Sequence, residues 1–349
     1  MSTPTLADLG GWPAVLGRIV DRIDLTPDQT RAALADVLAG SASPAQLAAF
    51  LVGIRVKGET VEELTGFHGA LMEAATLVEV PDEMRERLVD IVGTGGDRTH
   101  SVNVSTMAAL VVAGGGVPVA KHGSRAASSK CGAADVLEAL GMRIELDPDD
   151  VRRCLERTGM AFCFAQRFHS ALRHAGPVRR ELGVPTLFNQ LGPMANPVRV
   201  RRYVLGVADW SVADRMLAVM RNTGVVRAMV VQGDGGLDEL SISGPSRVLE
   251  LHDGVVRPHT IDPTQFGIAL APLETIKGGE PALNADIVRR TLAGETGPVR
   301  DIVSLNAGAG LYVGGAAASM AEGVDLARAV LDDGRALAVL DGLVAASLG

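Results

Sequence analysis

Residues 90–106 contain the residue types that a protein uses to surround a phosphate group. An apolar run over 88–92 ends at Gly93-Thr94-Gly95-Gly96-Asp97, and an apolar helical run begins at Met107. Glycines let main-chain N–H groups approach an anion closely, and a helix N-terminus adds donors and a favourable dipole. Hydroxyl and amide side chains lie between the two runs: Thr99, Ser101, Asn103, Ser105 and Thr106. This order of strand, glycine loop, polar turn and helix predicts an anion-binding loop.

The glycine loop departs from the commoner phosphate-binding patterns. Its glycines lie at positions 93, 95 and 96, so it is neither a P-loop nor Gly-x-Gly-x-x-Gly. It also carries a carboxylate, Asp97, which would repel a bare phosphate. We therefore expect Asp97 to contact a sugar hydroxyl, a metal ion or a loop amide. A plain glycine turn between a strand and a helix is the simpler explanation of the loop.

Two further segments carry side chains suited to a phosphorylated substrate. Residues 121–135 follow a strand-like run and bring together cations, an imidazole and hydroxyls: Lys121, His122, Arg125, Ser128, Ser129 and Lys130. Such a loop is a plausible second anion cradle. Asp238 and Glu239 are adjacent carboxylates after another strand, a pair suited to Mg²⁺ that is shared with substrate phosphates. Each segment alone could be a solvated surface loop, but together they indicate a phosphorylated substrate with bound metal.

Composition limits the function classes that need consideration. The chain has 349 residues, of which 47% are apolar and only 3% aromatic, so alanine, valine and leucine must build its core. A net charge of −8 argues against non-specific nucleic-acid binding. Three cysteines without CxxC spacing predict neither a disulfide framework nor a zinc site. We find no signal-peptide pattern and no apolar run long enough for a membrane, and we expect a cytoplasmic protein.

The first 80 residues are expected to form a small helical domain. Capping-box patterns begin at Thr26, Ser43 and Thr60, the first two with proline at the first helical position. Each precedes apolar residues at helical spacing. Residues 167–183 are also helical in pattern, and we expect them to pack back on this domain.

Residues 81–349 are expected to form a larger α/β domain. Short β-rich runs alternate with helical stretches, a pattern that predicts a mostly parallel sheet with helices on its faces. The predicted strands cover 88–92, 117–120, 161–164, 204–207, 228–232 and 248–252. The predicted helices cover 134–140, 148–158, 211–223, 283–294 and 313–333.

The motifs, taken in order, resemble the anthranilate phosphoribosyltransferase family. The matching strings are GTGGD (93–97), NVST (103–106), KHGSRAASSKCGAAD (121–135), VRRELGVPTLFNQLGPMANP (178–197), GDGGLDE (233–239) and KGGEPALNA (277–285). They occur in family order and spacing, and the resemblance covers nearly the whole chain, including the helical N-terminus. Pyrimidine nucleoside phosphorylases are similar in fold but share fewer of these strings.

The resemblance implies transfer of the phosphoribosyl group of phosphoribosyl pyrophosphate (PRPP) to the amine of anthranilate. The products are N-(5-phosphoribosyl)anthranilate and pyrophosphate, and two Mg²⁺ ions and a homodimer through the helical domain are expected. By the same resemblance, Ser105, Asp238 and Glu239 would hold metal. No residue is assigned as a general acid or base, because an aromatic amine is already nucleophilic. The expected PRPP-binding residues are Gly93, Thr94, Gly96, Asp97, Thr99, Asn103, Ser105, Thr106, Lys121, Ser128 and Ser129.

The acceptor half departs from the family pattern. The resemblance implies that His122, Ser124 and Arg179 contact the acceptor, with Arg179 pairing with its carboxylate. The family usually has asparagine where this chain has Ser124, and proline at the positions of Gln166 and Ser170. These departures leave a different aromatic acceptor open as an alternative. A non-catalytic paralogue and a nucleoside phosphorylase are the remaining ones.

Three other reactive side chains are expected to be structural. His169 and His174 lie in a helical pattern and are expected to be structural or surface residues rather than ligands. Cys131 lies inside the second anion loop, where we expect it to fill space rather than act as a nucleophile.

Overall fold

The N-terminal bundle begins each main helix at a predicted cap. The computed structural model describes residues 4–126 and 129–349. After a short 3-10 helix, η1 (Ala7–Leu9), the bundle contains α1 (Gly11–Val20), α2 (Pro27–Leu38), α3 (Pro44–Lys57) and α4 (Val61–Glu73). Thr26, Ser43 and Thr60 each complete a reciprocal capping box at the start of α2, α3 and α4. The sequence prediction of these helix starts is confirmed.

The larger domain contains a seven-stranded sheet of order β3-β2-β1-β4-β5-β6-β7. Its parallel strands are β1 (Val89–Gly93), β2 (Val119–Gly123), β3 (Met160–Phe164), β4 (Arg202–Gly206) and β5 (Arg227–Gln232). Strands β6 (Ser246–His252) and β7 (Val255–Ile261) extend it in antiparallel fashion. Every predicted strand overlaps an observed one, so the predicted fold class is confirmed. Strand β7 was not predicted because it is mostly exposed, lacks a continuous apolar run and contains a proline, Pro258.

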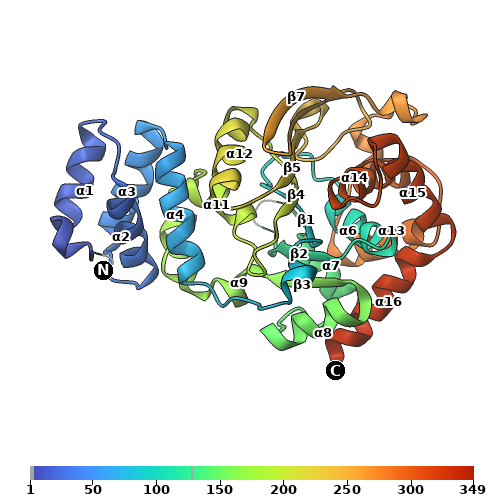
Figure 1. Ribbon diagram of the computed structural model, residues 1–349, viewed down its shortest axis with the longest axis horizontal. Coiled ribbons are helices and arrows are strands. Elements are labelled where there is room, and N and C mark those ends of the chain that lie inside the picture. Colours follow the sequence, from blue (N-terminus) through green and yellow to red (C-terminus); the bar gives the residue numbers. More distant parts are fainter. Residues whose placement is uncertain (1–3, 127–128) are drawn as a thin grey trace.

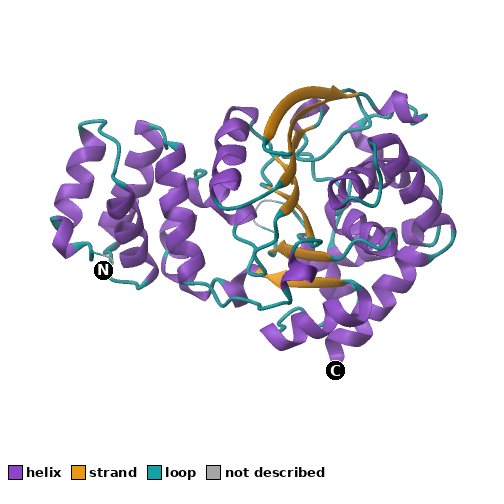
Figure 2. Ribbon diagram, in the orientation of Figure 1, coloured by secondary structure: helices purple, strands orange, loops and turns teal. Residues whose placement is uncertain are grey.

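Helices cover both faces of the sheet (Figures 1 and 2). Helices α6 (Val104–Gly114) and α14 (Pro298–Gly314) pack together on one face, against β1. Helix α12 (Ala213–Asn222), after η3 (Trp210–Val212), packs on the other face beside α4 of the bundle. Helix α11 (Leu187–Met194) also contacts α4, which places the helical domain on that side of the sheet.

The larger domain contains further helices. They are α5 (Asp82–Arg85), α7 (Ala133–Ala139), α8 (Pro148–Thr158), α13 (Pro281–Leu292), α15 (Met320–Asp332) and α16 (Arg335–Leu348). Short 3-10 turns occur at η4 (Asp234–Gly236), η5 (Pro263–Phe266) and η6 (Leu273–Ile276). None of the helices in the described residues is both long and apolar enough to cross a bilayer.

Two predicted helices are interrupted. The predicted helix over 167–183 is divided into α9 (Ala165–Phe168), η2 (Ser170–His174) and α10 (Gly176–Leu182), because His169 has a non-helical backbone with φ −117° and ψ 50°. Helix α10 contacts α3, and η2 contacts α2. The predicted helix over 313–333 was wrong at its start, since α14 ends at Gly314 and Gly315 has a φ of 84°.

Candidate functional site

The predicted anion loop and carboxylate pair meet at the carboxyl ends of the parallel strands. The order of the sheet reverses at β1 and β4, and ligands bind parallel α/β sheets at such a point. The N–H of Gly95, in the loop after β1, donates to Asp238 Oδ2 at 2.6 Å. The N–H of Ser105, at the start of α6, donates to Glu239 Oε1 at 3.0 Å. The structure therefore joins two motifs that the sequence could only suggest separately.

Glycine is required at two strand ends by the closeness of Asp238. A Cβ atom added to Gly93 would lie 2.2 Å from Asp238 Oδ2. A Cβ atom added to Gly206, at the end of β4, would lie 1.5 Å from the Asp238 carbonyl oxygen. Both distances are far below van der Waals contact. These glycines thus allow the loop after β5 to lie directly over the ends of β1 and β4.

Three carboxylates, Asp97, Asp238 and Glu239, lie close together here. Burial and the nearby Asp97 raise the pKa of Asp238 to about 7. Burial and the charge of Asp238 raise the pKa of Glu239 well above its ordinary value. Glu239 Oε2 is buried and has no hydrogen-bond partner within the described residues. Asp97 Oδ1 accepts the N–H of Thr99 at 3.1 Å, which is a loop-amide contact of the kind expected for it.

The oxygen atoms of Asp238, Glu239 and Ser105 are suitable ligands for a Mg²⁺ ion that a substrate also binds. Carboxylate and hydroxyl oxygens are the ligands Mg²⁺ prefers, and it usually takes only one or two carboxylates from the protein and the rest from phosphates or water. A cation would also offset the burial and the carboxylate repulsion that raise the pKa values of Asp238 and Glu239. Within residues 4–126 and 129–349 there is no group of three or more His, Cys, Asp or Glu side chains that could hold a metal alone. Two carboxylates leave coordination positions of a bound Mg²⁺ for phosphate oxygens or water.

Lys121 lies beneath this cluster. Its side chain is buried, and Nζ donates to the Ile91 carbonyl at 2.5 Å and to Ser105 Oγ at 3.3 Å. Burial lowers the pKa of Lys121, while the carboxylates of Asp90, Glu239 and Asp238 oppose that shift. The second anion loop thus contributes one cation that reaches the start of α6.

Other residues that the sequence predicts to bind PRPP form hydrogen bonds within and between the loops. Asn103 donates from Nδ2 to the Cys131 carbonyl at 3.2 Å and accepts from Asn284 Nδ2 at 2.9 Å, which joins residues 103, 131 and 284. The Cys131 thiol is buried and its pKa is raised to about 11, so it is a poor nucleophile, as expected. The Thr106 hydroxyl is buried in α6 and has no partner among the described residues. Ser129 Oγ donates to the Cys131 carbonyl at 3.4 Å, and Ser128 lies outside the described residues.

His122 lies beside a histidine whose role the sequence did not indicate. The rings of His122 and His169 meet edge to face, with centroids 5.2 Å apart. His169 Nε2 is 2.7 Å from the Ala195 carbonyl, while His169 Nδ1 and His122 Nε2 are buried without a partner in the described part of the chain. Burial lowers the pKa of both, so the rings are neutral near pH 7. His169 was hard to find because β3 and α9 bring it to His122 from a distant part of the chain.

The predicted acceptor residues Arg179 and Ser124 stand apart from this cluster. The Arg179 guanidinium lies over the Phe188 ring, 5.1 Å from its centroid, and burial lowers its pKa. Ser124 is exposed, and its hydroxyl donates to the Arg125 carbonyl at 2.8 Å. Gln166 and Ser170 are also exposed. In the described part of the chain, no hydrogen bond or ion pair joins Arg179 or Ser124 to the residues predicted to bind PRPP or metal.

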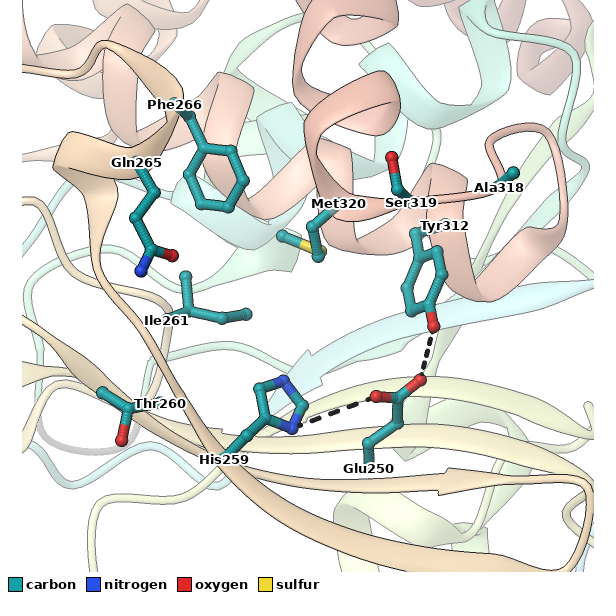
Figure 3. Close-up of a pocket in the computed structure, with 10 residues that line it drawn as sticks. All are labelled: Glu250, His259, Thr260, Ile261, Gln265, Phe266, Tyr312, Ala318, Ser319 and Met320. Atoms are coloured by element: carbon teal, nitrogen blue, oxygen red, sulfur yellow. Dashed lines mark hydrogen bonds and ion pairs between the residues drawn. The ribbon is translucent and has the colours of Figure 1, made fainter.

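Two cavities lie away from the predicted site. One of about 320 Å³ lies at the β6–β7 edge and is lined by residues that include Glu250, His259 and Tyr312 (Figure 3). Tyr312 Oη donates to Glu250 Oε1 at 2.7 Å there. Another of about 150 Å³ lies between α4 and β4, beside His68 and Tyr203. Neither contains a predicted site residue.

Comparison with known proteins places the chain in a family. Residues 13–75 match the helical bundle domain of the glycosyl transferase family, and residues 85–337 match its a/b domain. An anthranilate phosphoribosyltransferase from Nocardioides sp. is 49% identical over 341 residues, which cover 96% of this chain and 98% of the relative. The one from Chloroflexus aggregans is 46% identical over 336 residues, again 96% of this chain and 98% of the relative.

Solved structures agree. The anthranilate phosphoribosyltransferase of Thermus thermophilus superposes with a TM-score of 0.90 at 43% identity, covering 96% of this chain and 99% of that one. The enzyme from Saccharomyces cerevisiae, in complex with PRPP and Mg, superposes with a TM-score of 0.87 at 26% identity, covering 97% and 98%. With these matches along nearly its full length, the chain belongs to the anthranilate phosphoribosyltransferase family of glycosyl transferases.

Proposed function

We propose that this protein transfers the phosphoribosyl group of PRPP to the amine of anthranilate. The observation that carries the proposal is the joining of the glycine loop, Ser105 and Lys121 with the carboxylates of Asp238 and Glu239 at the switch point of the sheet. Anion-binding amides, a cation and a metal-binding pair in one place suit a substrate with several phosphates. The complex of the yeast relative with PRPP and Mg supports the same substrate.

In this reaction the C1–O bond to pyrophosphate breaks and a C1–N bond to anthranilate forms, while the amine proton passes to solvent. Amides of residues 93–97 with Thr99, Asn103 and Ser129 would bind PRPP, and Lys121 would offset negative charge beneath Ser105. Two Mg²⁺ ions, held by Asp238, Glu239 and Ser105, would neutralise the leaving pyrophosphate when bound. The protein's own part is to orient the ribose and to place fixed donors where the leaving charge develops.

The acceptor side would hold anthranilate for attack. Arg179 would pair with the carboxylate, because its planar fork matches two carboxylate oxygens and it has no ion-pair partner within the described residues. The neutral ring of His122 would border the aromatic amine. Positioning of the amine against C1 then supplies the rate enhancement, without a general base.

Transfer to an aromatic acceptor other than anthranilate is the alternative that residues 124, 166 and 170 favour. Ser124 has a shorter side chain than the asparagine usual in the family, and Gln166 and Ser170 replace prolines. An altered acceptor pocket would take a substituted aminobenzoate in place of anthranilate, with the donor half unchanged.

We also propose a homodimer formed through the helical domain. This domain exposes four large apolar side chains on α1, the turn after it and α3: Val20, Ile23, Val52 and Val56. A second copy of the chain would remove these side chains from water, which stabilises an interface. The proposed division of the chain is residues 1–80, with 167–183 packed on them, and residues 81–349. Buried free cysteines suit the reducing cytoplasm that we propose for it.

Pyrophosphate release tests the proposed function. We expect release to require PRPP, Mg²⁺ and anthranilate together. Release with another aminobenzoate but not with anthranilate would favour the altered acceptor. Phosphorolysis of thymidine or uridine would contradict the proposal in favour of a nucleoside phosphorylase, and PRPP binding without any turnover would indicate a non-catalytic paralogue.

A further inference from the structure

Strands β1 and β2 stop pairing just before the residues of β2 that contribute to the site, Lys121 and His122. Their ladder contains a single residue pair, Val89 with Val119, whereas β1 and β4 pair along five residues. Beyond that pair, within the described residues, main-chain groups of β2 form hydrogen bonds with side chains and not with the main chain of β1. Asp90 Oδ1 accepts the N–H of His122 at 3.2 Å, and Asn196 Nδ2 donates to the Ala120 carbonyl at 2.7 Å. The two strands are thus held apart by side chains in place of a continued ladder.

The two residues that fill this gap are bound to each other. Asn196 Nδ2 donates to Asp90 Oδ2 at 2.8 Å, and Asn196 Oδ1 accepts the N–H of Val198 at 2.9 Å. Asp90 is 0% exposed and Asn196 is 1% exposed. A carboxyl group buried in the middle of an apolar strand is costly unless its oxygens are bonded and a cation lies near. Lys121 is that cation. Burial raises the pKa of Asp90 to about 6, although the charge of Lys121 acts to lower it.

The position of this pair matters because Lys121 and His122 are consecutive in β2. Successive side chains in a strand point to opposite faces of the sheet. Lys121 accordingly reaches Ser105 on the α6 face, while His122 meets His169 on the other face. Any shift of β2 against β1 would therefore move a donor-side cation and an acceptor-side ring together.

The segment that carries Asn196 also holds the second ring. The Ala195 carbonyl, one residue earlier, contacts His169 Nε2 at 2.7 Å. Asn196 itself is bonded to β1 through Asp90 and to β2 through Ala120. The relative placement of β1, β2 and His169 is thus fixed at one buried point.

From this geometry we infer that Asp90, held by Asn196, is a positioning residue that sets the spacing of β1 and β2 and so places Lys121 and His122 at once. The inference rests on the proposed function, in which Lys121 serves PRPP and His122 serves the acceptor. Asp90 touches neither substrate and acts only through its neighbours. Its loss should therefore affect both substrates, whereas loss of a residue on one side affects one.

The test is the variant Asp90→Asn, which keeps the size of the side chain but turns one of its two acceptor oxygens into a donor. Either the His122 N–H or the Asn196 amide then loses its acceptor. We expect kcat/KM to fall about tenfold or more for both PRPP and anthranilate, since one buried contact is broken. The dissociation constant for PRPP, measured by calorimetry with Mg²⁺ present, should rise in parallel. Far-UV circular dichroism and melting temperature report whether the variant is folded.

A swapped pair and a matched control separate positioning from general destabilisation. The double variant Asp90→Asn with Asn196→Asp restores a donor-to-acceptor contact between the two side chains but removes the amide donor to the Ala120 carbonyl. We therefore expect it to recover only part of the lost kcat/KM. Glu63→Gln alters another buried carboxylate, which binds Lys57 and the Leu25 N–H in the helical bundle. It should lower the melting temperature and leave both KM values unchanged.

The outcomes decide between the inference and the proposed function. A folded Asp90→Asn variant with kcat/KM and PRPP affinity within about twofold of wild type would overturn the inference. So would a loss that Glu63→Gln reproduces at equal destabilisation, or one confined to a single substrate. If the wild type binds PRPP but does not consume anthranilate, the proposed function fails, and the PRPP affinities of the two proteins still decide the role of Asp90. A wild type that binds no PRPP overturns both. If Asp90→Asn does not fold, Asn196→Ala is measured in the same way and decides by the same criteria.

Discussion

The main-chain N–H of Gly95 donates to Asp238 Oδ2 at 2.6 Å, a bond between residues 143 positions apart. It fixes the glycine loop after β1 to the carboxylate pair after β5. Each segment alone could be an ordinary surface turn. Their contact at the switch point of the sheet brings loop amides and carboxylate oxygens together in one place.

Replacement of Gly93 by alanine should disable this site. The added Cβ would lie 2.2 Å from Asp238 Oδ2, so the carboxylate must move away from the loop. We expect kcat to fall by about 100-fold, because a displacement of about 1 Å in a positioned group costs that much. The matched control is Gly17→Ala in α1, where an added Cβ has nothing within 4 Å. Equal activity of the two variants would show that the Asp238 position is unimportant.

Neutralising the carboxylate pair should abolish turnover without unfolding the protein. The double variant Asp238→Asn with Glu239→Gln removes the proposed metal ligands. It also removes a repulsion, since burial and neighbouring carboxylates raise both pKa values. We expect a melting temperature at pH 8, without metal, no lower than that of the wild type. Near-normal activity of the variant at saturating Mg²⁺ would contradict the metal-binding role.

The same shifts predict how stability depends on pH. The pKa of Asp238 is about 7 in the folded protein against an ordinary 3.8, so the folded state binds more protons between these values. Stability should therefore fall as pH rises from about 4 to about 7, and stay low above that range. The melting temperature of the wild type relative to the double variant, followed from pH 4 to 8, measures this contribution. A difference that is independent of pH would rule out the raised pKa values.

The backbone elements were largely predictable from the sequence. Capping boxes at Thr26, Ser43 and Thr60 depend on local contacts, so spacing alone located them. The parallel strands are apolar runs buried on both faces and were also found. Strand β7 was not, because it is an exposed edge strand held by hydrogen bonds to β6. Local pattern fails where pairing with another strand decides the structure.

Arg179→Ala should raise the KM for anthranilate and leave the KM for PRPP unchanged. A charge-assisted contact with a carboxylate is worth roughly 1.5–3 kcal/mol, so the increase should be at least about tenfold. Arg179→Lys should restore little, because lysine lacks the planar fork. Steady-state kinetics with each substrate varied in turn makes the measurement. A change confined to PRPP would contradict the placement of Arg179 on the acceptor side.

The proposed dimer can be disrupted at its apolar face. Val56 is 67% exposed on α3, and Val56→Glu would place a charge in the buried centre of the interface. We expect a monomer by light scattering after size exclusion. Val255→Glu, at a 48% exposed valine in β7, is the matched control and should remain a dimer. A monomeric wild type, or a dimeric Val56→Glu, would contradict the proposed interface.

The site was less predictable than the fold. Asp238, Glu239 and the glycine loop could be predicted as site residues because their residue types are distinctive, and the structure brings them together. Asp90 was missed, although a carboxylate inside an apolar strand is a visible signal, because its role depends on Asn196 far along the chain. The sequence pattern favours a structural role for His169, and its ring contact with His122 becomes visible only in three dimensions.

The most direct test of the proposed function is the rate at which anthranilate fluorescence disappears in the presence of PRPP and Mg²⁺, beside a panel of substituted aminobenzoates. We expect anthranilate to be consumed fastest, only when PRPP and Mg²⁺ are both present, with pyrophosphate released in equal amount. Consumption of another aminobenzoate without consumption of anthranilate would contradict the account of the acceptor site. No consumption of any of them, with PRPP still bound, would contradict the transferase function itself.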